Sequence, residues 1–152
     1  MLVTLTWTEC RVAVTAGTHR RLVNLEKRSH EVYGQVADGT QWDVDIEAVA
    51  AEMAAAKGLG LFHGLADSAA DDRAGDIAPG VQVRHTRRQN GSLICHDRDP
   101  DDHRFVLVVG SLPTFRVVGS IMGAKAKDKR FWRTDVRTAA YFVPQSELAP
   151  PA

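Results

Sequence analysis

Residues 71–88 read DDRAGDIAPGVQVRHTRR. An acidic cluster is followed by a Pro-Gly turn, and then by alternating apolar and polar residues that end in arginines. The alternation of Val81 and Val83 with Gln82 and Arg84 predicts a β-strand with two different faces. The pattern before this stretch is mainly helical and the pattern after it is mainly extended. The expected fold class is therefore α+β, with a mixed, mainly antiparallel sheet flanked by helices.

The strongest helical pattern lies at residues 43–60, DVDIEAVAAEMAAAKGLG. Asp43 or Asp45 is expected to cap this helix, and Gly58 and Gly60 are expected to end it. Apolar residues at helical spacing predict a buried stripe of Ile46, Val49, Ala50, Met53 and Ala54. Glu52 falls on the flank of that stripe, from which it would reach the edge of a sheet packed under the helix. The surplus of alanines predicts a close approach between this helix and the sheet.

The remaining elements follow from the same patterns. Residues from about Thr4 to Arg28 are expected to be helical, with Leu5, Val12, Leu22 and Leu25 in the core. Residues 64–76 are expected to form a loop, and DRDPDD at 97–102 a hairpin turn. We expect one domain over residues 1–146, with a helical part at 3–60 and a β-rich part at 76–146, followed by a loose tail at 147–152.

The composition excludes several classes of protein. The 19 basic and 19 acidic residues cancel, so any nucleic-acid surface must be a local patch. Cys10 and Cys95 have no CxxC spacing, which argues against a disulfide scaffold or a structural zinc site. No apolar stretch is long enough to cross a membrane, and the N-terminal residues do not resemble a secretory signal. These features predict a cytoplasmic protein, or one of the host cytoplasm if the chain is phage-encoded.

A basic run with interleaved aromatic residues lies at 125–133, KAKDKRFWR. Lysine and arginine side chains suit a nucleic-acid backbone, and an aromatic ring suits stacking on a base. The predicted DNA-binding residues are Lys125, Lys127, Lys129, Arg130 and Trp132, with Arg87 and Arg88 as a second basic stretch. The alternative is a solvated loop whose aromatic side chains fill the core.

A second group of residues suggests metal chemistry. Gln82 and Arg84 share one face of the predicted strand, Asp76 precedes them across a turn, and Glu52 lies on the covering helix. Carboxylate and amide oxygens are the ligands that Mg²⁺ or Mn²⁺ prefers, and a cation beside them would stabilise charge on a phosphate. The alternative is a turn aspartate, a solvated strand face and a surface glutamate.

The segments DIEAVAAEMAAAKGLG and VQVRHT, with an aspartate between them, resemble the PD-(D/E)XK nuclease superfamily. The likeness is to small phage or prophage members of the restriction-endonuclease-like, RecB-like or resolvase-like type, and FRVVGSIMGAKAKDKRFW and AAYFVPQSELAP extend it. The resemblance implies a restriction-endonuclease-like core and Mg²⁺- or Mn²⁺-dependent hydrolysis of DNA. It places Glu52, Asp76, Gln82 and Arg84 at the catalytic positions. The metal ligands would be Glu52, Asp76, the Gln82 side chain and the Val83 carbonyl.

Two residues depart from the family motif. Gln82 stands where the family has an acid, which would weaken metal binding. Arg84 stands where the family has lysine, and arginine stays protonated, so it would clamp phosphate and not act as a base. The resemblance therefore leaves open a catalytically inactive DNA-binding relative, and a small phage protein that binds a host protein is a third hypothesis. A homodimer is possible, because many members of the superfamily act as dimers.

Overall fold

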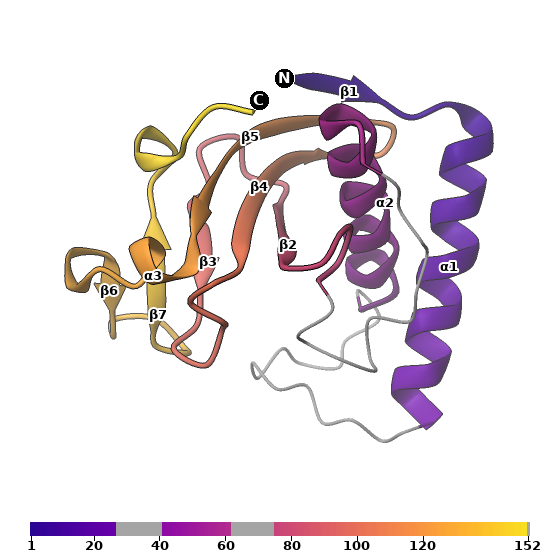
Figure 1. The fold of residues 1–152 in the computed structure, drawn as a ribbon. Helices are drawn as coiled ribbons and strands as arrows, with labels where there is room; N and C mark the ends of the chain where they lie inside the picture. The colour runs from indigo at the N-terminus through magenta and orange to yellow at the C-terminus, as the bar shows by residue number, and fades with distance from the viewer. Residues whose placement is uncertain (27–40, 62–74, 152) are drawn as a thin grey trace.

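The computed structural model describes residues 1–26, 41–61 and 75–151. The fold is α+β, with helices and a mixed sheet (Figure 1). The elements in chain order are β1 (Leu2–Thr4), α1 (Trp7–Glu26), α2 (Gln41–Leu59), β2 (Val81–Thr86), β3 (Leu93–Cys95), β4 (Arg104–Ser111), β5 (Thr114–Met122), α3 (Gly123–Ala126), η1 (Lys129–Phe131), β6 (Trp132–Arg133), β7 (Ala140–Val143) and η2 (Gln145–Glu147).

Helix α1 begins three residues later than the predicted Thr4. The Thr6 hydroxyl accepts from the Glu9 amide at 3.2 Å, and the Glu9 carboxylate accepts from the Thr6 amide at 2.6 Å. This reciprocal capping fixes the start at Trp7 and leaves residues 2–4 free to pair with β5. Arg28, where the helix was expected to end, lies outside the described residues.

The core predicted on α1 is partly wrong. Leu5 is buried, but Leu22 and Leu25 are about half exposed. The buried side of α1 consists of small residues, Cys10, Ala13 and Gly17, which let α2 approach closely. The larger apolar side chains lie on the other side of the helix, where Trp7 and Val14 are also exposed.

Helix α2 matches its prediction best. It starts at Gln41, so the predicted caps Asp43 and Asp45 lie inside its first turns. It continues through Gly58 and ends at Leu59, followed by Gly60 with a positive φ of 65°. Its buried alanines, Ala50, Ala51, Ala54, Ala55 and Ala56, pack in a core with residues of β1, β2, β4 and β5. The close approach expected from the alanines is therefore present.

The main sheet has the order β1-β5-β4-β2. The β1–β5 and β4–β5 pairs are antiparallel, and β2 pairs with β4 in parallel, so the predicted mixed, mainly antiparallel sheet is confirmed. Strand β4 is buried on both faces. Val106 and Val108 belong to the core against α2, whereas Phe105, Leu107 and Val109 belong to a second core on the opposite face.

A second sheet, of order β3-β7-β6, covers that opposite face (Figure 1). Strand β3 pairs with β7 in this sheet and not with β4. The predicted hairpin turn at 97–102 is therefore wrong: the segment between Cys95 and Arg104 crosses from one sheet to the other. Its Asp99 is buried at 9% exposure.

The tail expected to be loose is anchored. Ala149 and Ser120 of β5 exchange two backbone hydrogen bonds, at 2.8 and 2.9 Å. Leu148 packs against the core between the two sheets, and Glu147 forms an ion pair with Arg130 at 2.8 Å. These contacts tie residues 147–149 to the rest of the domain.

Candidate functional site

Asp76 is fixed beside the free edge of β2. Its amide donates to the Val81 carbonyl at 2.8 Å, and its Oδ2 accepts from the Val83 amide at 2.6 Å. The preceding Gly75 has a φ of 81°, and a Cβ there would lie 2.2 Å from the Ala78 carbonyl oxygen. Only glycine fits this tight turn, which brings the Asp76 carboxylate back along the strand.

Glu52 extends from α2 and is buried, with 5% exposure. Arg20 of α1 holds it through two parallel hydrogen bonds, Nη1 to Oε1 at 2.8 Å and Nη2 to Oε2 at 2.9 Å. This two-point contact is the strongest geometry for an arginine and a carboxylate. It fixes the Glu52 carboxylate between the two helices and the sheet.

The charges of Asp76 and Glu52 interact. Burial is the main cause that raises the pKa of Asp76 to about 6, and the charge of Glu52 raises it further. The hydrogen bond from the Val83 amide and the charges of Arg84 and Arg20 act in the opposite direction. Asp76 Oδ1 accepts no hydrogen bond from any residue that the structure describes. A partly buried carboxylate with a like charge nearby is a frequent feature of functional sites.

The Gln82 and Arg84 side chains leave β2 on the other face, toward the second sheet. Gln82 Nε2 lies 3.5 Å from His103 Nδ1. Arg84 forms an ion pair with Asp99 at 2.9 Å, and its guanidinium lies 5.0 Å from the centre of the Phe105 ring. The structure thus brings Asp76 and Glu52 together, but it does not direct the Gln82 side chain to them.

The backbone of Val83 belongs to the same edge as Asp76. The Val83 amide donates to Asp76, and its carbonyl oxygen accepts a 3.4 Å hydrogen bond from Arg84 Nη1. Arg84 therefore bends around the strand toward this edge, although its main partner is Asp99. This position agrees with its effect on the pKa of Asp76.

Sequence reasoning missed the role of Arg20. The structure pairs Arg20 with Glu52 across 32 positions. The helical period contains a signal for this: Cys10, Ala13 and Gly17 form the buried side of α1, and Arg20 continues the same stripe one turn later. A charged residue on a buried stripe needs a partner.

The fit to a divalent cation rests on few groups. Across residues 1–26, 41–61 and 75–151, no cluster of three or more His, Cys, Asp or Glu side chains has metal-binding geometry. The oxygen donors at the edge of β2 are the Asp76 and Glu52 carboxylates and the Val83 carbonyl. They are hard ligands of the type that Mg²⁺ and Mn²⁺ accept, with remaining positions normally filled by water.

The predicted basic surface is partly neutralised. Lys127 has the most partners: its Nζ donates to the backbone oxygens of Asp97 and Asp99 at 2.7 and 2.5 Å and pairs with Asp101 at 2.7 Å. These contacts anchor the segment that joins the two sheets. Arg130 pairs with Asp128 and Glu147, at 3.3 and 2.8 Å.

The other predicted DNA-binding residues differ in their environment. Arg87 pairs with Glu47 at 2.6 Å and lies 3.9 Å from Asp43. Trp132 is 40% exposed and packs on Tyr141, with ring centres 4.7 Å apart. Arg88, Lys125 and Lys129 are exposed and form no ion pair with any described residue. These three are the cations that remain available.

Comparison with known proteins identifies no relative of this chain: no family model, no curated protein and no solved structure matches it. Within the described ranges, no helix combines the length and apolar character that crossing a bilayer requires.

Proposed function

We propose that this protein is a divalent-metal-dependent nuclease that hydrolyses DNA phosphodiester bonds on a restriction-endonuclease-like core. The carboxylate pair of Asp76 and Glu52 is the observation that carries this proposal. Glu52 lies on α2 and Asp76 in the turn before β2. The two groups share a partly buried site, and the pKa of Asp76 is raised to about 6 by burial and by the charge of Glu52. Bringing two such carboxylates together costs stability, which a bound cation would offset.

Three groups would hold Mg²⁺ or Mn²⁺: Asp76 through Oδ1, Glu52 and the Val83 carbonyl. A cation bound there would supply an activated water and neutralise charge on the phosphate. Gln82 is not among the ligands that we propose, because its amide lies beside His103.

The surrounding arginines have separate roles in this proposal. Arg20 orients the Glu52 carboxylate and reduces its repulsion with Asp76. Arginine binds phosphate in preference to acting as a base, so Arg84 would bind a phosphate oxygen and would not accept a proton.

A panel of duplex, junction, flap and single-stranded DNA, incubated with Mg²⁺, Mn²⁺ or EDTA, tests the proposal. Asp76→Asn should reduce cleavage at least about 100-fold, because even outer-shell partners of a metal contribute 10–100-fold. Asp135→Asn is the matched control, since Asp135 is an exposed acid that pairs only with Arg133 among the described residues. Calorimetric titration of Mn²⁺ gives a readout that does not depend on cleavage. Cleavage that survives EDTA or Asp76→Asn would contradict the proposal.

The second candidate is a DNA-binding relative without catalytic activity. The two-point contact between Arg20 and Glu52 favours it, because both oxygens of that carboxylate already have a cationic partner. In this case DNA binding would be unaffected by EDTA, and Mn²⁺ titration would show no binding that depends on Asp76.

A further inference from the structure

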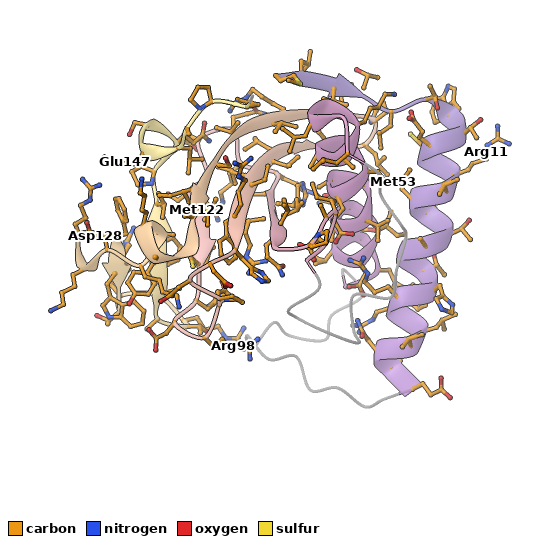
Figure 2. The ribbon with its side chains drawn as sticks, viewed as in Figure 1. Arg11, Met53, Arg98, Met122, Asp128 and Glu147 are labelled. Carbon is orange, nitrogen blue, oxygen red and sulfur yellow. The ribbon has the colours of Figure 1, made fainter. Side chains whose placement is uncertain are left out.

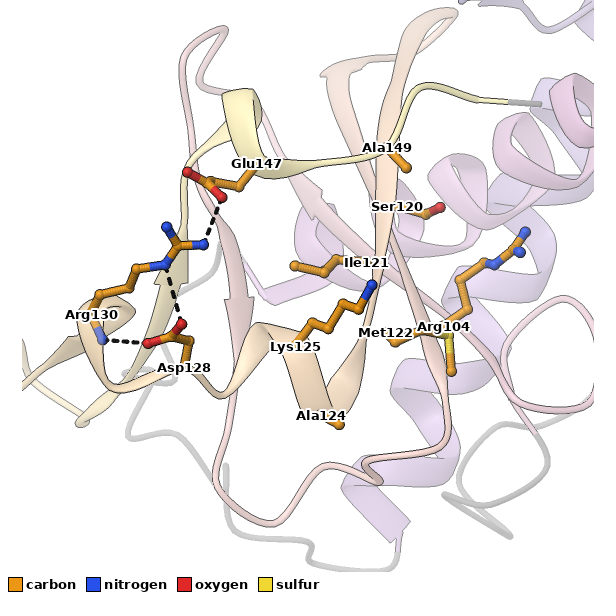
Figure 3. Close-up of a pocket in the computed structure, with 10 residues that line it drawn as sticks. All are labelled: Arg104, Ser120, Ile121, Met122, Ala124, Lys125, Asp128, Arg130, Glu147 and Ala149. Carbon is orange, nitrogen blue, oxygen red and sulfur yellow. Dashed lines mark hydrogen bonds and ion pairs between the residues drawn. The ribbon is translucent and has the colours of Figure 1, made fainter.

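An open pocket of about 520 Å³ lies away from the carboxylate pair, and none of the four predicted catalytic residues lines it (Figure 3). It is formed by the end of β5, by α3, and by residues 147–149, which are hydrogen-bonded to β5 through Ala149. Figure 2 shows Met122, Asp128 and Glu147, which line it, on the opposite side of the molecule from Arg11 of α1. Its size is in the range of small-molecule sites.

One part of this pocket is cationic. Arg104 and Lys125 line it, and neither forms an ion pair with any described residue. In Figure 3 the Lys125 amine is directed toward Ser120 and Ile121, with Arg104 on one side of it. Arginine and lysine together with a hydroxyl group are typical donors to a phosphate group.

The other part of the pocket has the opposite character. Asp128 and Glu147 both pair with Arg130, so two negative charges share one positive charge. A second anionic group would be repelled there, whereas a neutral group that donates hydrogen bonds would be accepted. The lining also includes the apolar residues Ile121, Met122 and Ala124.

We propose that this pocket binds a nucleoside monophosphate unit, with the phosphate on Arg104 and Lys125 and the neutral nucleoside toward Asp128 and Glu147. This ligand class has a dianionic group at one end and a neutral ring with amino donors at the other. The inference does not rest on the proposed nuclease activity, because it needs neither a metal nor the Asp76–Glu52 pair.

Titration of ¹⁵N-labelled protein with deoxyadenosine monophosphate, inorganic phosphate and deoxyadenosine, followed by NMR, tests this site at low salt. Deoxyadenosine monophosphate should shift the amides of Ser120, Met122 and Lys125, and it should bind more tightly than either fragment. Lys125→Met and Arg104→Met should each weaken binding about tenfold or more, because each removes a charge-assisted contact to phosphate. The spectra of the free variants show whether they are folded.

Arg11→Met is the control. Arg11 is an exposed cation of α1 that does not line the pocket. Its replacement should change the affinity less than twofold. An equal loss with Arg11→Met and Lys125→Met, or no shift of the pocket amides at millimolar nucleotide, would overturn the proposal.

Binding of oligonucleotides shows whether the nucleoside monophosphate unit is the end of a DNA strand or a free nucleotide. Tight, Lys125-dependent binding of a 5′-phosphorylated single strand, with competition by the mononucleotide, supports the proposal and identifies a strand end as the ligand. Binding of the mononucleotide alone supports it with a free nucleotide as the ligand. Equal binding of a 5′-hydroxyl strand at the same amides would mean general attraction to the DNA backbone and would overturn it.

Discussion

The Asp76 carboxylate shows how the environment of one residue changes its chemistry. Its pKa is raised from 3.8 to about 6, mainly by burial and then by the charge of Glu52. The folded protein therefore holds this proton more tightly than the unfolded chain does. Ionised Asp76 therefore destabilises the fold by roughly 2–3 kcal/mol.

Asp76→Asn should stabilise the protein above pH 6. Asparagine keeps the oxygen that accepts from the Val83 amide and removes the buried charge. The gain over the parent protein in free energy of unfolding should be smallest near pH 4, rise between about pH 4 and 6, and stay level above that. Urea denaturation at several pH values measures it.

Asp135→Asn is the control for this pH dependence. Its hydrogen bonds with Arg133 lower the pKa of Asp135, so the sign is reversed. The ionised form of Asp135 favours folding above its unfolded pKa, and its replacement should not stabilise the protein at pH 7. A gain for Asp76→Asn that is independent of pH would mean that Asp76 ionisation is not its source.

Arg20 and Glu52 form an ion pair whose side chains are only 12% and 7% exposed, so each charge is compensated mainly by the other and little by water. Arg20→Met should lower the free energy of unfolding by about 3–5 kcal/mol, because it leaves Glu52 charged without its arginine. Arg20→Met combined with Glu52→Gln should lose less than the sum of the two single changes. Denaturation of the four proteins in this cycle measures the coupling. Additive losses would show that the pair is not coupled energetically.

At the scale of elements, the contact between α1 and α2 depends on one glycine. A Cβ at Gly17 would lie 2.5 Å from the Ile46 Cα and 2.9 Å from its backbone nitrogen. Backbone atoms cannot move aside as a flexible side chain does. The two helices must therefore separate to accept any larger residue, and this separation would also displace Arg20 from Glu52.

Gly17→Ala should destabilise the protein, although alanine favours an exposed helix by about 1 kcal/mol over glycine. The loss should be about 1–3 kcal/mol in free energy of unfolding, as for overpacked cores. Thermal and urea denaturation measure it. Thr15→Ala on the exposed part of α1 is the control and should change stability by less than about 0.5 kcal/mol. A stabilised Gly17→Ala protein would mean that the helices are not in close contact.

For the whole molecule, net charge and ion pairing limit how strongly it can bind DNA. The formal charge is zero. Of the cations predicted to contact DNA, Arg88, Lys125 and Lys129 form no ion pair with any described residue. The others are held by acids, and breaking those pairs on binding would cost part of the energy gained from phosphate contacts.

We therefore expect a weak salt dependence of DNA binding. Three phosphate contacts give a slope of about −3 in log K against log salt, since each contributes about 0.9. Replacing Arg88, Lys125 and Lys129 together by glutamine should bring the slope close to zero, as fluorescence anisotropy would measure. Arg11→Gln is the control, because Arg11 lies on the opposite side of the molecule from Met122 and Asp128 (Figure 2). A slope near −5 would show that the paired cations Arg87, Lys127 and Arg130 also bind phosphate.

Local patterns were sufficient for part of this description. The apolar period and the following glycines placed α2 within a few residues, and the continuous apolar run of β4 agrees with its burial on both faces. The change from helical to alternating pattern near residue 80 indicated the α+β class. These features depend on neighbours in the chain, and the periods of helices and strands are local properties.

Only the tertiary structure determined which distant residues meet. Strand β3 pairs with β7, more than 40 positions later, to form the second sheet. Arg20 reaches Glu52, and Lys127 is enclosed by backbone oxygens of the segment between the sheets. The sequence predicted the Asp76–Glu52 proximity from the helix and strand patterns and from a family resemblance, but it could not show that Gln82 points to the other face. The physical reason is that a charge or an amide takes its role from whichever groups packing brings within a few ångströms, and packing depends on the whole chain.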